Sequence, residues 1–119
     1  MKKDIKEQWV KALRSGEYKQ GRHALKKEID GEFFHCCLGV LCELATKAAV
    51  PVDAQRSEID GIWTFNGRVG DLPEAVMEWS GMESSVGVLP DDLPFMNLAG
   101  RNDSGQSFTR IAEVIEEHF

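Results

Sequence analysis

Residues 36–45 read CCLGVLCELA, and this stretch decides the fold. Its apolar residues cover nearly every side of a helix, and the stretch is long enough to form one, which predicts a helix buried all round. The predicted helix covers residues 36–49 and stops at Pro51, because a helix usually ends at or before the residue that precedes proline. We therefore expect this helix at the centre of the protein.

Further helices are expected on both sides of the central one. Asp4 and Glu7 have the spacing of a capping box at the start of an apolar stripe, and Gly16 follows that stripe as a C-cap. Ser107 can cap a C-terminal helix whose apolar residues fall on one face. The three predicted helices cover residues 4–15, 73–80 and 107–119.

Two β-hairpins are expected between these helices. The first connects residues 24–28 and 32–35 through a short turn that contains Asp-Gly. The second connects residues 62–65 and 68–69 through the Asn-Gly pair at 66–67, which is a strong hairpin signal. The sequence therefore predicts helices combined with short antiparallel strands.

The fold class that follows is α+β, in a single domain over residues 1–119. A chain of 119 residues with 42% hydrophobic and 29% charged residues has the composition of one ordinary globular domain. Residues 52–60 are polar and are expected to form a loop, and residues 82–100 are expected to form a loop with short helical pieces.

The compartment is predicted to be the cytoplasm. The first residues are charged rather than apolar, unlike a signal peptide, and the longest apolar stretch is interrupted by charged residues, so no membrane span is expected. The three cysteines cannot all pair with one another, and we expect free thiols.

Charge is distributed unevenly along the chain. Residues 1–27 hold nine of the 14 Lys and Arg but three of the 20 acidic residues, which gives this segment about +6 and leaves about −12 for the other residues. The net charge of −6 argues against general nucleic-acid binding. The basic segment can attract a small anionic ligand, or it can contact the acidic face of a second copy and form a homo-oligomer. Both faces can also be merely solvated.

A cysteine nucleophile is one candidate for chemistry. Cys36 or Cys37 at a helix N-terminus would have a lowered pKa, and His23 on the facing strand is the better candidate for its base. The alternative is that the cysteines are small packing residues of an apolar helix. The cysteine spacing fits no zinc site, so no metal and no cofactor are expected.

A ligand-binding surface is the other candidate. The ring of Tyr18 can stack on a base while Lys19 and Arg22 contact phosphate. The alternative is that Tyr18 packs over the first helix, that the cations are solvated, and that the polar loop at 101–105 has only turn chemistry. The predicted ligand-binding residues are Tyr18, Lys19, Gln20, Arg22, His23, Arg101 and Asn102.

Four groups of residues carry a resemblance to a known family. They are Trp9-x-x-Ala12-Leu13-x-Ser15-Gly16-x-Tyr18-x-Gln20, the CCLGVLC run at 36–42, Leu72-Pro73, and Asn102-Asp103-x-Gly105-x-Ser107-Phe108-x-x-Ile111-Ala112-x-x-Ile115-Glu116. In these motifs the chain resembles a family of small uncharacterised proteins encoded by bacteriophages and prophages. The resemblance implies a phage protein in the host cytosol, and it assigns no catalytic residue.

Three functions are therefore expected, of which the first is favoured. The first is a non-enzymatic phage protein that sequesters a small anionic, nucleotide-like ligand in counter-defence. The second is an acidic inhibitor that presents acidic residues to a basic surface of a host defence protein. The third is a cysteine-dependent hydrolase or transferase. The acidic residues of the second reading are Asp91, Asp92, Glu113, Glu116 and Glu117.

Overall fold

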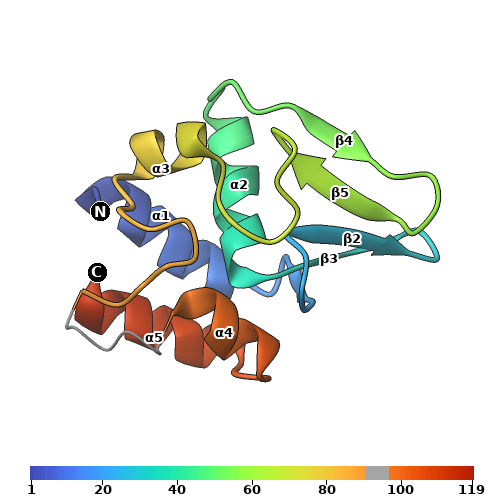
Figure 1. Ribbon diagram of the computed structural model, residues 1–119. Helices are drawn as coiled ribbons and strands as arrows, with labels where there is room; N and C mark the ends of the chain where they lie inside the picture. The colour runs from blue at the N-terminus through green and yellow to red at the C-terminus, as the bar shows by residue number, and fades with distance from the viewer. Residues whose placement is uncertain (91–96) are drawn as a thin grey trace.

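The computed structural model describes residues 1–90 and 97–119, and within them the α+β class is confirmed. Helix α2 (Cys37–Lys47) lies between a mixed β-sheet and the remaining helices (Figure 1). The other helices are α1 (Lys3–Arg14), α3 (Glu74–Ser80), α4 (Leu98–Asp103) and α5 (Phe108–His118). The strands are β1 (Lys19–Gln20), β2 (Lys26–Ile29), β3 (Glu32–His35), β4 (Ala54–Arg56) and β5 (Ile62–Phe65).

The predicted central helix is confirmed. Its apolar residues other than Leu44 are buried, as is Cys36 just before it, and α1, α3 and α4 pack against it. Gly39 lets the helix lie close to Leu25, the residue before β2. A Cβ atom at Gly39 would lie 1.7 Å from the carbonyl oxygen of Leu25. Trp9 of α1 donates a hydrogen bond from its indole nitrogen to the Cys37 carbonyl at 2.9 Å, which fixes α1 against the start of α2.

The strands are arranged in the order β1-β3-β2-β5-β4. The predicted first hairpin is present as β2 and β3, which pair antiparallel and place Lys26 opposite His35. Its turn residues Asp30 and Gly31 both have positive φ, which favours Asp and Gly at these positions. Strand β1 pairs parallel with β3 and forms one edge of the sheet.

The second hairpin differs from the prediction. The Asn-Gly turn at 66–67 is present with positive φ at both residues, but the return segment makes a single bridge, between Phe65 and Arg68. The main partners of β5 are β2 and β4. Strand β4 lies inside residues 52–60, which the sequence analysis assigned to a loop, because Ala54-Gln55-Arg56 lacks the apolar alternation that signals a strand.

Helix boundaries follow the predictions within one or two residues, with one correction at the start of α1. That helix begins at Lys3, and its N-cap residue Lys2 makes no side-chain capping bond, so the predicted capping box of Asp4 and Glu7 does not form. Ser107 caps α5 as expected and accepts a hydrogen bond from the Arg110 amide at 3.2 Å.

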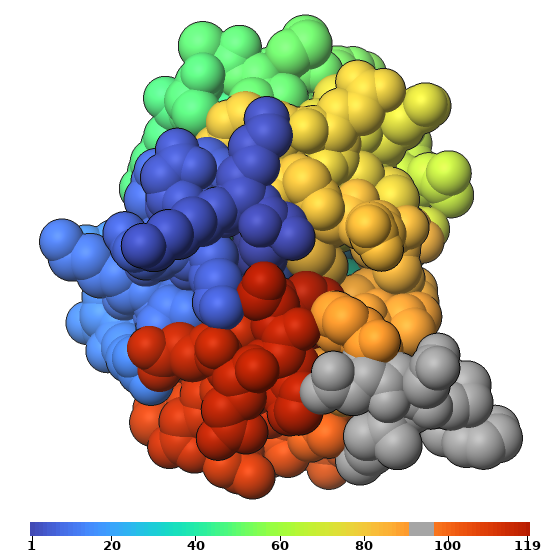
Figure 2. Space-filling model, turned by 90° about the vertical axis from the view of Figure 1, so that its left-hand side faces the viewer, coloured from blue at the N-terminus to red at the C-terminus, as the bar shows by residue number. Residues whose placement is uncertain are grey.

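The N-terminal and C-terminal helices lie side by side on one face of the molecule (Figure 2). Both are amphipathic and bury one stripe each: α1 buries Ile5, Trp9 and Leu13, and α5 buries Ile111 and Ile115. No helix of the described residues combines the length and the apolar character needed to cross a bilayer.

Candidate functional site

Two of the predicted ligand-binding residues, Gln20 and Asn102, form a hydrogen-bond network inside the protein. The Gln20 side-chain nitrogen donates to Asn102 Oδ1 at 2.9 Å, and Asn102 Oδ1 also accepts from the Cys37 amide at 3.1 Å. The Asn102 side-chain nitrogen donates to the Gly21 carbonyl at 2.8 Å. Asn102 is fully buried. These amides therefore connect β1, α2 and α4, and their hydrogen bonds are already made within the chain.

Arg101 belongs to the same neighbourhood, and its place corrects the sequence analysis. Residues 101–103 form the last turn of α4 rather than part of a polar loop. The guanidinium of Arg101 donates from Nη1 to Gln106 Oε1 at 3.2 Å. Short helical pieces are expected within residues 82–100, where α4 begins, but its six residues show no sustained apolar period that would extend a predicted helix to Asp103.

Arg22 and His23 lie on the surface beside α4. The backbone amide of His23 donates to Asp103 Oδ1 at 2.9 Å, and its ring Nδ1 lies 3.4 Å from Asp103 Oδ2. Arg22 is exposed, with its guanidinium close to Gly105. Tyr18 and Lys19 face another way: Tyr18 accepts a hydrogen bond from Lys47 at 3.1 Å, and Lys19 pairs with Glu32.

The predicted lowering of the cysteine pKa values is wrong. Cys36 is 3% exposed, and burial raises its pKa to about 11; burial raises the pKa values of Cys37 and Cys42 well above the ordinary range as well. Desolvation of the thiolate outweighs the backbone amides at the start of α2. The side chain of His23, the proposed base, is 76% exposed and faces Asp103. The geometry therefore gives the hydrolase or transferase reading no activated thiol.

Metal binding likewise has no cluster to support it, since residues 1–90 and 97–119 contain no group of three or more His, Cys, Asp or Glu side chains placed to share an ion.

The acidic residues of the inhibitor hypothesis are partly neutralised by the chain itself. Glu113 pairs with Arg110, and Glu116 pairs with Arg14. Glu117 lies 3.6 Å from a ring nitrogen of His118. Asp91 and Asp92 lie outside the described residues.

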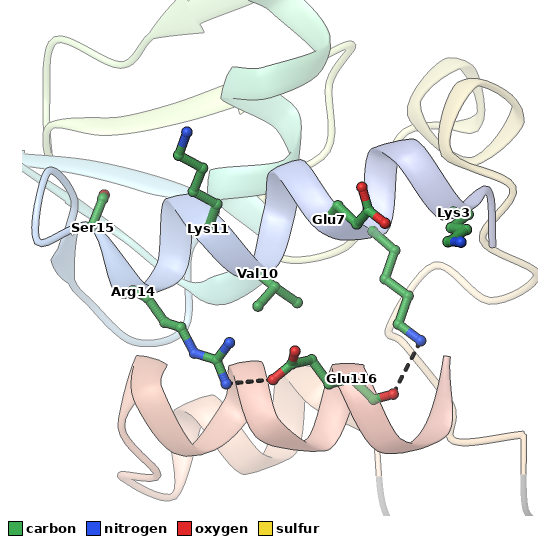
Figure 3. Close-up of a pocket in the computed structure, with 8 residues that line it drawn as sticks. Lys3, Glu7, Val10, Lys11, Arg14, Ser15 and Glu116 are labelled. Atoms are coloured by element: carbon green, nitrogen blue, oxygen red, sulfur yellow. Dashed lines mark hydrogen bonds and ion pairs between the residues drawn. The ribbon is translucent and has the colours of Figure 1, made fainter.

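A groove along α1, bordered by α5, is the best candidate site (Figure 3). It has a volume of about 690 Å³, which is within the range of small-molecule sites. Val10 points into the space between the two helices, whereas Lys11 and Ser15 stand along the other border of α1 (Figure 3). Among the described residues, its lining consists of Lys3, Lys6, Glu7, Val10, Lys11, Arg14, Ser15 and Glu116.

One side of this groove is fixed by contacts of Glu116. The Glu116 carboxylate accepts a hydrogen bond from the Arg14 guanidinium, and its backbone carbonyl accepts one from Lys6 Nζ at 3.1 Å. That carbonyl lies in the last turn of α5, where carbonyl groups lack helical partners and favour a cation. Lys6 and Arg14 are thereby held at the border between the two helices.

The remaining cations of the groove are open to solvent. Lys3 and Lys11 are exposed and make no hydrogen bond or ion pair with the part of the chain that the structure describes. The lining carries four cationic side chains against the carboxylates of Glu7 and Glu116, within a chain whose net charge is −6. This is a local excess of positive charge on an otherwise acidic protein.

The uneven charge already indicates the basic segment, and most of the predicted ligand-binding residues lie in its later part, whereas the groove is lined by its earlier part, from Lys3 to Ser15. Lys3, Glu7 and Lys11 recur every four residues, so helical spacing already puts them on one face of α1. The second wall, from α5, depends on how the two ends of the chain pack together, and charge counting does not show it.

These features define a small α+β protein with a central buried helix and a cationic groove where its two terminal helices meet. The family whose model matches residues 1–119 is described as Domain of unknown function (DUF8296), and the chain belongs to that family. No curated protein and no solved structure matches it. The family description names no activity, so the functional argument rests on the groove.

Proposed function

We propose that this protein binds a small anionic ligand of nucleotide size in the groove between α1 and α5. The observation that carries the proposal is the pair of exposed lysines, Lys3 and Lys11, which line the groove together with Arg14. Lysine and arginine make the strongest hydrogen bonds of proteins with phosphate and carboxylate groups. The lysine stems that line the groove offer apolar area to the rest of the ligand.

The sequestering role is part of the same proposal. The resemblance to phage proteins favours a counter-defence protein that captures a nucleotide signal of the host, and capture requires binding without chemistry. The buried thiols, with their raised pKa values, agree with such a role. Self-association remains a companion prediction, because an acidic surface of a second copy can compete for the same lysines.

Calorimetric titration with a panel of cyclic nucleotides, and with inorganic pyrophosphate as a simple anion, tests the proposal. We expect saturable binding that weakens as salt rises, since exposed charges are screened. Lys11→Glu should weaken binding by about tenfold or more, the loss expected when one charge-assisted hydrogen bond is removed.

The matched control is Lys27→Glu, which makes the same charge change on β2 at a residue outside the groove lining. It should leave affinity nearly unchanged. Equal losses in both variants would show that only net charge matters, and absence of binding for every anion at high micromolar concentration would refute the proposed ligand class. Native mass spectrometry of the same samples reports the oligomeric state.

A further inference from the structure

A second pocket lies at the junction of β1, β3 and α2, away from the α1–α5 groove. Its volume is about 480 Å³, within the range of small-molecule sites. Tyr18 precedes β1, Phe33 and His35 come from β3, Lys26 from β2 and Glu43 from α2. Phe33 and His35 are two residues apart on one strand, and Lys26 pairs with His35, so these side chains share a face of the sheet.

His35 is the unusual group in this pocket. Its side chain is 5% exposed, and neither ring nitrogen makes a hydrogen bond within residues 1–90 and 97–119. Nε2 lies 3.3 Å from Glu43 Oε2 without the alignment of a hydrogen bond. Buried polar side chains nearly always have partners, so Nδ1, which has none within the described residues, is the ring atom of His35 that can meet a ligand atom, whereas Nε2 contacts Glu43.

Two aromatic rings flank His35. The Tyr18 ring meets the His35 ring edge-on, with 5.2 Å between their centroids. Phe33 is 44% exposed, and the ammonium of Lys26 lies 4.7 Å from the centre of its ring. Lys26 covers one face of Phe33, so the exposed part of the ring is available to a flat group that stacks on it.

The charges of this pocket are balanced, in contrast to the groove. Lys19 lies 2.5 Å from Glu32, and Lys26 lies 3.4 Å from Glu43. Burial alone raises the pKa of Glu43, but the neighbouring His35 and Lys26 outweigh burial and hold that pKa below its ordinary value. Each cation therefore already has a carboxylate partner, which leaves no attraction for a phosphate.

A flat, uncharged ring with hydrogen-bond donors and acceptors meets these conditions, and the purine and pyrimidine bases have this chemistry. We propose that the pocket beside His35 binds a nucleobase, which stacks on Phe33 and exchanges a hydrogen bond with the His35 ring. The site is independent of the α1–α5 groove, and it selects the base rather than the phosphate.

Two-dimensional amide NMR during titration with adenosine, guanosine, cytidine and uridine tests this proposal. These nucleosides are uncharged, so failure of the groove proposal leaves the result intact. We expect at least one of them to give saturable shifts on β1, β3 and Glu43, with a Kd at or below about 1 mM. AMP should bind the pocket no more tightly than adenosine.

Two variants separate binding from folding. Phe33→Leu keeps apolar bulk but removes the ring, and His35→Phe keeps a buried ring but removes Nδ1, which has no partner in the described structure, together with the Nε2 contact to Glu43. Phe33→Leu should keep the melting temperature, and both variants should lose nucleoside affinity by tenfold or more, whereas Lys11→Glu should keep nucleoside affinity. Shifts absent for all four nucleosides, shifts confined to α1 and α5, or full affinity in Phe33→Leu would overturn the assignment.

Discussion

The start of α2 and the α1–α5 groove use polar residues in opposite ways. Around Asn102 the polar groups are buried and each finds a partner inside the chain, at distances of 2.8–3.1 Å. In the groove Lys3 and Lys11 are exposed and keep their donors for solvent or a ligand. A polar residue whose hydrogen bonds are made within the chain contributes to stability, whereas one without such bonds is available for binding.

The strongest test of this contrast is Asn102→Ala. The change removes four hydrogen bonds and leaves the Cys37 amide and the Gly21 carbonyl without these partners, so we expect a loss of about 4 kcal/mol in unfolding free energy. Urea denaturation followed by circular dichroism measures it.

Asn97→Ala is the matched control for that substitution. Asn97 caps α4 with one hydrogen bond, from the Gly100 amide at 2.7 Å, and its loss should cost about 1 kcal/mol. Similar losses in both variants would contradict the idea that the Asn102 network, rather than any asparagine of α4, joins β1 to α2.

The buried thiols predict that the stability of the protein depends on pH. An unfolded cysteine ionises near 9.0, whereas folded Cys36 ionises near 11, so between these values the unfolded state binds fewer protons and stability falls as pH rises. The contribution is fully present below pH 9.0 and is lost as pH rises through the folded pKa, and the difference between the two pKa values corresponds to about 3 kcal/mol.

Denaturation curves at pH 7 to pH 11 for the wild type and Cys36→Ala check this expectation, because lysine and tyrosine titrations are common to both proteins. The wild type should lose more stability over the alkaline range. Native cysteines should also react slowly with iodoacetamide at neutral pH and quickly after unfolding. Rapid labelling of the folded protein would restore the nucleophile reading.

Local patterns predicted the elements that carry their own signals. Residues 36–45 are apolar all round, Ser107 is a cap, and Asp-Gly favours a tight turn, so α2, α5 and the first hairpin follow from a few neighbouring residues. Strand β4 is polar, and its place at the sheet edge depends on β5. Local propensity therefore does not predict such a strand.

The residues of the candidate sites also differ in how far local sequence patterns predict their contacts. Gln20 and Asn102 were predicted to bind a ligand. Their side chains bond to each other across 82 positions of sequence, and no local pattern predicts such a bond. The basic charge of α1 was visible in composition, but the groove exists only because α5 returns from the far end of the chain to lie beside α1. Composition thus indicated where the positive charge lies along the chain, and tertiary packing determined where the groove forms.

The smallest expected effect on stability comes from Arg14→Ala. The ion pair of Arg14 with Glu116 connects two helices, yet its side chains are 40% and 50% exposed. Exposed ion pairs contribute little because water screens them and two long side chains lose freedom, so the unfolding free energy should change by less than about 0.5 kcal/mol.

Anion affinity in the groove should nevertheless fall by about tenfold in Arg14→Ala, since a phosphate contact is lost. Urea denaturation and calorimetry on the same sample give both values. Val10→Ala serves as the converse control, because it removes apolar area at the α1–α5 junction and should cost stability through packing. If Arg14→Ala instead destabilised the fold by more than about 2 kcal/mol, the ion pair would be a structural link between the terminal helices. The groove would then resemble the Asn102 network, and the distinction between its polar residues and the buried ones would fail.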